Sequence, residues 1–272
     1  MPVDKKPVSG RGPVVWLHDF REDGEVTYRM GRRGGSWVAD WPGIARLTCD
    51  ESGRNPRLKP RTGAQPSSVL KLGGVTKALV TDLRGGLGLH ASAVVLGSRA
   101  VLVLGESGAG KSTAAAALCR RAGARLLADD AACVELHGNV VTVAPSEDRH
   151  YLTPESGRAL GVRPEEGKLA TNQKMIVPAP ERGGRSSPLA LIAWLRFDDS
   201  IGQAVVRPLG GADAVLRVLG SMFRFRLDDR GEELDRVMRL FQQAPFVDIV
   251  RPRSAPDVVE HIVRALESCH GA

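Results

Sequence analysis

One short stretch, Gly105–Thr113, constrains what this chain can fold into more than any other. It reads GESGAGKST and matches the pattern G-x-x-x-x-G-K-[ST] at every fixed position. The apolar run Val101–Leu104 before it predicts a buried strand, and the helix formers Ala114–Leu118 after it predict a helix. A strand, a glycine loop and a helix in this order are typical of a phosphate-binding loop. The alternative, a glycine-rich turn with a chance Lys-Ser pair, is disfavoured by the flanking strand and helix.

The residue types of this stretch have distinct chemical uses. Its glycines let the backbone turn tightly and aim N–H groups at phosphate oxygens, and the following helix presents its positive dipole end to the same anion. The Lys111 ammonium can reach the β- and γ-phosphates, and the Ser112 hydroxyl can ligate Mg²⁺. ATP and Mg²⁺ are therefore the expected cofactors. The expected nucleotide-binding residues are Gly105, Glu106, Ser107, Gly108, Ala109, Gly110, Lys111, Ser112 and Thr113.

The composition is that of an ordinary soluble globular protein. The 272 residues are 42% hydrophobic and 25% charged. Aromatic residues make up 4%, which disfavours stacking platforms for single-stranded nucleic acid. The net charge of +7 comes from arginines that are spread over the chain rather than clustered. We therefore expect no nucleic-acid partner.

Three features of the sequence predict a cytoplasmic location. The first residues, MPVDKKPVSGRGP, contain no apolar signal segment. No apolar run reaches the roughly 18 residues that a membrane span needs. The four cysteines show no C-x-x-C spacing, as is typical of free thiols in a reducing compartment. We therefore expect no membrane partner.

Turn signals divide the chain into a small β-rich N-terminal unit, residues 1–65, and a larger α/β unit, residues 66–272. Within the first unit, the Pro/Gly-rich segment 51–65 predicts a loop. Apolar residues at helical spacing predict a helix over Ser67–Leu83, and a continuous strand is expected over Leu87–Val95. The polar residues 161–188 predict a mobile loop over a site.

Two adjacent carboxylates follow the apolar run Arg125–Ala128. Carboxylates that leave a strand beside a phosphate loop can hold Mg²⁺ or accept the proton of an attacking hydroxyl, and Asp129 with Asp130 would supply both roles. The alternative is a solvated turn, because aspartate is frequent in turns. These residue types leave the order of the two roles open.

A histidine and several cations are further candidates. His90 lies on the expected strand upstream of the loop, where it could hydrogen-bond a phosphoryl oxygen or a catalytic carboxylate. The alternative is a structural histidine whose hydrogen bonds are satisfied in the core. A cation from another segment can stabilise the negative charge of phosphoryl transfer. Lys174 is the foremost candidate because it lies in the expected mobile loop, and Arg149, Arg224 and Arg226 are the others.

Three motifs together resemble the C-terminal catalytic domain of HPr kinase/phosphorylase. They are HASAV at residues 90–94, GESGAGKST at 105–113 and RLLADD at 125–130. The resemblance implies a P-loop catalytic domain of the HPr-kinase-like type, related to phosphoenolpyruvate carboxykinase, and an ATP- and Mg²⁺-dependent kinase. It implies that Asp129 is the catalytic base and that Asp130 and Ser112 hold Mg²⁺. Lys111 would neutralise phosphate charge, and His90 would orient the base or the γ-phosphate.

A weaker resemblance covers the whole chain and points to HPr-kinase-related proteins of bacterial gene clusters. It rests on Tyr151–Glu155, Lys174 and the ending Ala244–Asp248. Some of these relatives phosphorylate a serine of a lasso-peptide precursor, and others act on free serine. The resemblance thus implies a peptide or protein that bears a serine hydroxyl as acceptor, and it is compatible with a homo-oligomer. A small-molecule kinase for free serine or a sugar, and an ATP-hydrolysing switch or assembly factor without a phosphoacceptor, are the alternatives.

The chain departs from true HPr kinases at two points. Thr113 stands where they carry a glutamate, and their E-[ILV]-R-G signature, which is linked to the phosphorylase reaction, is absent between residues 140 and 165. HPr itself is therefore a doubtful acceptor.

We predict from the missing signature that the reaction stops at phosphorylation. Phosphorylated product incubated with inorganic phosphate should release no pyrophosphate, which an enzymatic pyrophosphate assay measures directly. Ready release of pyrophosphate would show that the signature is not needed for that reaction.

Overall fold

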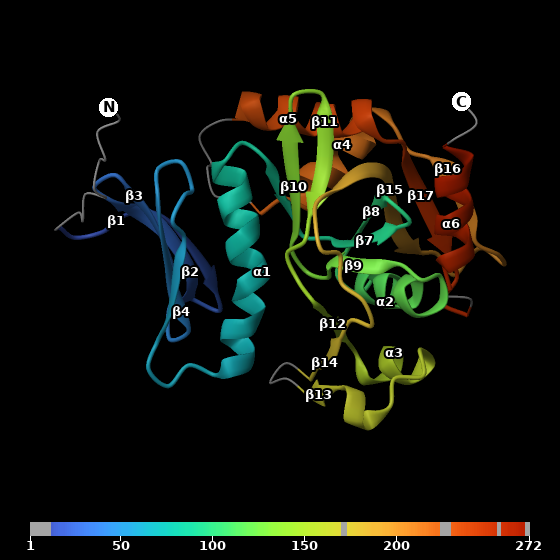
Figure 1. The fold of residues 1–272 in the computed structure, drawn as a ribbon, viewed down its shortest axis with the longest axis horizontal. Coiled ribbons are helices and arrows are strands. Elements are labelled where there is room, and N and C mark those ends of the chain that lie inside the picture. Colours follow the sequence, from blue (N-terminus) through green and yellow to red (C-terminus); the bar gives the residue numbers. More distant parts are fainter. Residues whose placement is uncertain (1–11, 170–172, 224–229, 255–256, 270–272) are drawn as a thin grey trace.

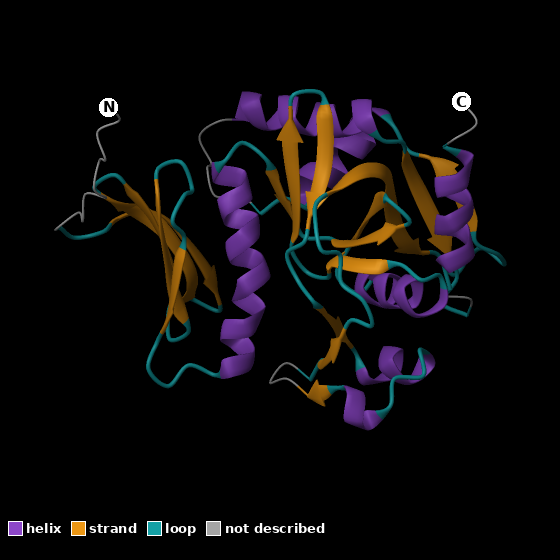
Figure 2. Cartoon of the chain, viewed as in Figure 1, coloured by secondary structure: helices purple, strands orange, loops and turns teal. Residues whose placement is uncertain are grey.

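Two sheets lie on either side of one long helix (Figure 1). The computed structural model describes residues 12–169, 173–223, 230–254 and 257–269, and it shows a mixed α/β protein (Figure 2). The N-terminal sheet is an antiparallel meander in which each strand pairs with the next. Its strands are β1 (Val15–Glu22), β2 (Glu25–Arg33), β3 (Ser36–Trp41), β4 (Ala45–Asp50) and β5 (Arg57–Pro60).

Strand β5 is a correction, because it lies inside the segment 51–65 that the sequence predicts as a loop. The strand is four residues long and only Leu58 points a large apolar side chain at the core, so it has no readable alternation. The strand forms because it pairs with Ala45–Thr48 of β4, a contact that the local sequence pattern of β5 does not predict.

The buried carboxylate of Asp40 on β3 ties together three arginines of the N-terminal unit. Asp40 is 0% exposed and accepts hydrogen bonds from Arg29, Arg46 and Arg61. Burial alone would raise the pKa of Asp40, but the bonds from these arginines outweigh it and hold the pKa below its ordinary value. Asp40 is therefore an ionised anchor for strands β2, β3 and β4.

Helix α1 (Pro66–Leu83) contributes to both cores and confirms the helix expected at Ser67–Leu83. Pro66 is in the first turn, where its missing N–H costs nothing. Leu72, Leu79 and Leu83 pack with the inner face of the N-terminal sheet. Ala78 packs instead with Ala131 and Cys133 of the larger unit. The helix is thus the connection through which the two units touch.

The larger sheet has parallel strands at its centre. Strand β15 (Ser187–Phe197) lies between β8 (Arg99–Gly105) and β17 (Phe246–Arg251) and is parallel to both. Antiparallel strands extend it on both sides, in the order β6-β10-β11-β15-β8-β7-β9, with β16 beyond β17. These strands are β6 (Leu87–Leu89), β7 (Ser92–Leu96), β9 (Arg125–Ala128), β10 (Ala132–His137), β11 (Val140–Ala144) and β16 (Val205–Pro208).

Two pairs of helices cover the faces of this sheet. Alternate residues of β8 enter two separate apolar clusters, as expected of a strand that is buried on both faces. One cluster includes α4 (Gly211–Gly220) and α5 (Arg230–Gln243), and the other includes α2 (Lys111–Arg121) and α6 (Val259–Ser268). Helix α2 therefore starts at the carboxyl end of a central parallel strand, where such sheets place their ligands.

Two further expectations need correction. The segment 161–188 is not one loop, because it contains two strands of a small third sheet. In this sheet β14 (Met175–Pro178) lies between β12 (Arg149–Leu152) and β13 (Lys168–Leu169), and the sheet adjoins α3 (Pro154–Ala159). The strand expected over Leu87–Val95 is broken in two between β6 and β7. The break falls at His90, whose backbone N–H instead bonds Ser221 O at 2.6 Å.

All four cysteines, Cys49, Cys119, Cys133 and Cys269, are free thiols, which confirms the expectation from their spacing. Within the described residues, no helix combines the length and the apolarity that crossing a bilayer requires.

We predict that Asp40→Asn destabilises the N-terminal unit. Its three arginines would lose their common negative partner, and we expect the free energy of unfolding to fall by roughly 2 kcal/mol, less than for a fully buried pair because the arginines are partly exposed. Urea denaturation measures this. Glu51→Gln, which removes an exposed pair with Arg32, is the matched control and should change little. Equal stability of the two variants would contradict the claim that Asp40 stabilises the N-terminal unit.

Candidate active site

A strand, a glycine turn and a helix follow one another from β8 to α2, in the predicted order. Gly105, Gly108 and Gly110 all have positive φ, at 151°, 80° and 85°. A Cβ on Gly105 would lie 2.6 Å from Leu195 O, so a larger residue does not fit there. The N-cap residue of α2 is Gly110, which has no side chain to cap the first amides of the helix. The N-terminus of this helix can therefore offer its N–H groups to an anion.

Lys111 is held inside the glycine turn. It is 7% exposed, and its Nζ donates to Gly105 O at 2.8 Å and to Glu106 O at 3.2 Å. Burial lowers the pKa of Lys111, the charge of Asp130 opposes that shift, and the charge of Lys174 adds to it. Within the described part of the chain, the hydrogen bonds of this ammonium go to carbonyl oxygens, so its charge is available to pair with a phosphate.

Asp129 is fully enclosed at the end of β9, and its residue is 1% exposed. Its Oδ2 accepts from Tyr151 N at 2.6 Å, and its Oδ1 accepts from Ser92 Oγ at 3.2 Å. His150 Nδ1 lies 3.6 Å from Oδ1, and Ser112 of the glycine turn is near enough to lower the pKa of this carboxylate. Burial would raise the pKa of Asp129, but the contacts with His150, Tyr151 and Ser112 outweigh it and hold the pKa below its ordinary value.

Asp130 is more open and contacts His90. Its side chain is 18% exposed, and Lys71 Nζ of α1 lies 3.5 Å from its Oδ2. His90 Nδ1 lies 3.3 Å from Asp130 Oδ1 and donates to the Asp130 carbonyl oxygen at 3.1 Å. Burial and the charge of Lys111 lower the pKa of His90, so the ring is neutral at pH 7. A carbonyl oxygen only accepts, so the proton is on Nδ1 and Nε2 keeps its lone pair.

The two carboxylates therefore have different environments, and the sequence alone could not say which of them has which role. Asp129 is ionised, buried and near Ser112 of the glycine turn. Asp130 is partly exposed and bonded to His90. The assignment of the base to Asp129 by resemblance stays a prediction, and these contacts favour the reverse order.

The candidate cations named from the sequence lie in different places. Lys174 lies near enough to Lys111 to lower the pKa of that lysine, so it is close to the glycine turn. Arg149 pairs with its neighbour Asp148 at the surface. Arg224 and Arg226 lie outside the described residues.

Glu147 is a residue of the site that sequence reasoning missed. Its Oε2 accepts from the backbone N–H groups of Asp129, Asp130 and Ala131, at 2.8, 2.8 and 3.2 Å. One carboxylate oxygen thus fixes the three consecutive amides that carry both aspartates. The only sequence signal was the polar run Glu147–His150 between apolar strands. Burial, the first cause, and the charge of Asp129 raise the pKa of Glu147 to about 7.

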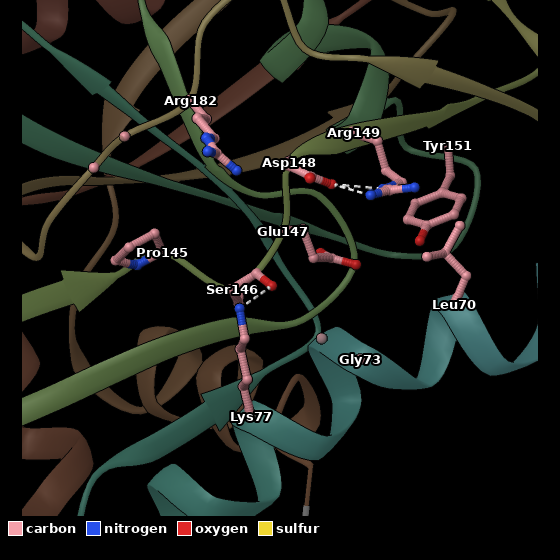
Figure 3. Close-up of a pocket in the computed structure, with 13 residues that line it drawn as sticks. Leu70, Gly73, Lys77, Pro145, Ser146, Glu147, Asp148, Arg149, Tyr151 and Arg182 are labelled. Carbon is pink, nitrogen blue, oxygen red and sulfur yellow. Dashed lines mark hydrogen bonds and ion pairs between the residues drawn. The ribbon is translucent and has the colours of Figure 1, made fainter. Parts of the chain in front are cut away.

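Glu147 also borders a hollow of about 460 Å³ between α1 and the segment before β12, which we call the α1 hollow (Figure 3). Lys77 reaches across from α1 and donates to Ser146 O at 2.8 Å. A Cβ on Gly74 would lie 2.8 Å from Glu147 Cδ, so α1 approaches the glutamate this closely only because residue 74 is glycine. The remaining lining includes Leu70, Gly73, Pro145, Asp148, Arg149, Tyr151 and Arg182–Gly184.

The residues present fit Mg²⁺ and a triphosphate. In the described part of the chain no group of three or more His, Cys, Asp or Glu side chains is placed to hold a metal ion. Mg²⁺ commonly needs less, since it binds through one or two carboxylates, waters and substrate phosphates. Ser112 fits this mode, because its hydroxyl oxygen keeps lone pairs for a cation and lies near the ionised Asp129. The two aspartates of the strand end supply carboxylate charge, and Lys111 with the N-terminus of α2 fits the phosphates.

Comparison with known proteins gives a likeness among solved structures. No protein-family model and no curated protein matches the chain. Among solved structures, the Hpr(Ser) kinase/phosphatase from Coxiella burnetii aligns with 68% of this chain and 99% of its own, at 16% sequence identity and a TM-score of 0.37. A likeness at this level carries no argument about function, so the function has to be inferred from the geometry of this chain's own residues.

We predict that Glu147 makes the stability of the protein depend on pH. An acid whose pKa is raised on folding contributes stability that is full below the unfolded pKa of about 4.3 and is lost as the pH rises through about 7. Relative to Glu147→Gln, the wild type should therefore lose on the order of 2–3 kcal/mol of unfolding free energy between pH 5 and pH 8.5.

Urea denaturation across this pH range measures the difference. The control is Glu181→Gln, an exposed glutamate on a neighbouring segment, whose pH profile should run parallel to that of the wild type. If the Glu147→Gln profile also ran parallel to the wild type, Glu147 would not be the titrating group.

Proposed function

We propose that this protein is a kinase that transfers the γ-phosphoryl group of ATP to a serine-type hydroxyl in the presence of Mg²⁺. The observation that carries this proposal is the pair of carboxylates beside the glycine turn. Asp129 is buried near Ser112, and Asp130 is partly exposed and lies 3.3 Å from His90 Nδ1. Nucleotide hydrolysis as a switch needs a metal-side carboxylate but no second one set to receive the proton of an acceptor. This pair favours phosphoryl transfer over such a switch.

Each residue of the glycine turn and its surroundings has its own part in this reaction. Lys111 and the amides of the glycine turn bind and orient the triphosphate. Asp129 lies near Ser112, whose hydroxyl oxygen keeps lone pairs for the metal. Mg²⁺, when bound, neutralises phosphate charge. Lys174, close to Lys111, adds positive charge where the transferred group becomes more negative.

Asp130 receives the proton of the acceptor in this proposal. The acceptor oxygen forms its bond to the γ-phosphorus as the bond from that phosphorus to the bridging oxygen of ADP breaks, and the hydroxyl proton passes to Asp130 Oδ. His90 Nδ1 donates to the backbone carbonyl of Asp130 and lies 3.3 Å from its Oδ1, so His90 positions the residue that carries the carboxylate. This order reverses the one implied by family resemblance, because Asp129 has no free access to a hydroxyl.

The resemblance of sequence motifs supports a peptide or protein as the serine-bearing acceptor. A small hydroxyl compound, such as free serine or a sugar, is the other outcome of an acceptor screen. Loss of ATP without any phosphorylated acceptor would instead support the hydrolytic switch.

Exchanging Asp129 and Asp130 one at a time for asparagine tests which aspartate accepts the proton and which acts through the metal. Asp130→Asn should keep ATP affinity while kcat falls by ~10² or more, the usual scale when a general base is lost. Asp129→Asn should instead raise the Mg²⁺ concentration needed for half-maximal rate. ATP binding by calorimetry and the Mg²⁺ dependence of phosphoryl transfer measure the two effects.

Asp148→Asn is the control, because Asp148 is a more exposed acid of the same region that pairs only with Arg149. The opposite pattern would restore the order implied by resemblance. Near-normal rates in both variants would rule out a catalytic role for this strand end.

A further inference from the structure

A second hollow, of about 640 Å³, opens beside His90, and we call it the His90 hollow. On one side it is lined by His90 and the first residues of the glycine turn, Gly105–Ser107. On the other side it is lined by Trp194 and Arg196 of β15 and by Arg217 of α4. It therefore joins the proposed reaction centre to two cations that the proposed function has not used.

The hollow lies at the acceptor side of the reaction centre. Lys111 Nζ, the partner expected for the β- and γ-phosphates, bonds Gly105 O and Glu106 O, two residues of its lining. His90, another lining residue, is bonded to Asp130. The opposite end of the glycine turn, at Thr113, is occupied by a hydrogen bond to Ser156 at 3.0 Å. An acceptor that reaches Asp130 past His90 would therefore lie in the His90 hollow.

The two arginines are held in place by one buried carboxylate. Asp248 of β17 is 0% exposed, and it lies 3.2 Å from Arg196 Nε, 2.9 Å from Arg207 Nη2 and 3.5 Å from Arg217 Nη1. The Arg217 guanidinium also lies 5.0 Å from the centre of the Trp194 ring. Arg196, Arg207 and Arg217 carry three positive charges, and Asp248 with Asp198, which lies 3.7 Å from Arg196, carries two negative ones. One positive charge of this cluster is therefore left over.

The surplus charge and its fixed position specify the chemistry of a ligand. Guanidinium groups present N–H donors in a planar fork that matches a carboxylate or a phosphate. Glu106 is the one acidic residue of the described lining. A neutral ligand would remove water from the charged groups of Arg217 and Arg196 without supplying a negative charge in its place. Such uncompensated desolvation of charge is unfavourable.

We propose that the His90 hollow is an acceptor subsite for an anionic group, a carboxylate or a phosphate, that lies near the hydroxyl to be phosphorylated. Arg217 and Arg196 bind this anion, and the hydroxyl then faces Asp130. The inference rests on the proposed function in that it names the chemistry of the acceptor. It deepens that function from a serine-type hydroxyl to one with a negative charge beside it.

The test measures anion binding to the His90 hollow while a nucleotide occupies the glycine turn. The wild type is saturated with Mg²⁺ and the non-transferable analogue AMP-PNP, and D-glycerate, glycerol 3-phosphate and glycerol are titrated by calorimetry. Glycerate and the phosphate ester should bind, and the tighter of the two identifies the anion as carboxylate or phosphate. Glycerol should bind at least tenfold more weakly than either.

Arg217→Gln should weaken binding of both anions at least tenfold and leave AMP-PNP affinity unchanged. Arg207→Gln is the matched control, because it removes an arginine from the same Asp248 without lining the hollow, and it should leave anion affinity within about twofold. Arg217→Lys keeps the positive charge, so its anion affinity should lie between those of the wild type and Arg217→Gln. Unchanged AMP-PNP affinity shows that each variant is folded.

Three results would overturn the subsite: no anion binding to the wild type, equal affinity for glycerol, or an equal loss in Arg207→Gln and Arg217→Gln. These are distinct from failure of the kinase itself. If the anions bind as described but no hydroxyl is ever phosphorylated, the proposed function falls and the anion site stands. If neutral hydroxyls are phosphorylated as well as acidic ones, the kinase stands and the subsite falls.

Discussion

The candidate site depends on keeping the Asp129 carboxylate ionised while it is completely enclosed. Burying a charge is unfavourable unless hydrogen bonds replace its water. Its partners come from β7 (Ser92), from α2 (Ser112) and from β12 (Tyr151 and His150). One charge thus requires three elements to converge on the end of β9. The glycine turn is held to the strand end by the same requirement, because Ser112 belongs to both.

A second carboxylate extends this constraint to the N-terminal unit. Glu147 holds the amides of Asp129 to Ala131, and Gly74 of α1 lies against it. Lys71 of the same helix contacts Asp130 directly. Because the other face of α1 is packed into the N-terminal sheet, a shift of that sheet would move groups that contact both aspartates. The N-terminal unit is therefore mechanically connected to the strand end and not only attached to it.

Local patterns in the sequence predicted the elements, and long-range contacts supplied what they could not. The glycine turn and helix α1 were readable because their signals lie within a few neighbouring residues. Strand β5 and the third sheet were missed because their strands have only two to four residues, too few to show an alternation of polar and apolar side chains. Glu147 was missed because its role depends on backbone amides that lie before β10 in the chain.

Three buried aspartates in this protein show how similar contacts can serve different ends. Asp40 is surrounded by arginines that line neither of the two hollows described above, so their surplus positive charge stabilises the sheet. Asp129 is surrounded by neutral donors and remains the negative member of its site. Asp248 is surrounded by arginines that line a hollow beside His90, so its surplus faces a place where a ligand can lie. The negative strand end and the positive hollow flank the same glycine turn. That is the charge pattern required to bring a hydroxyl with a nearby anion to a carboxylate that takes its proton.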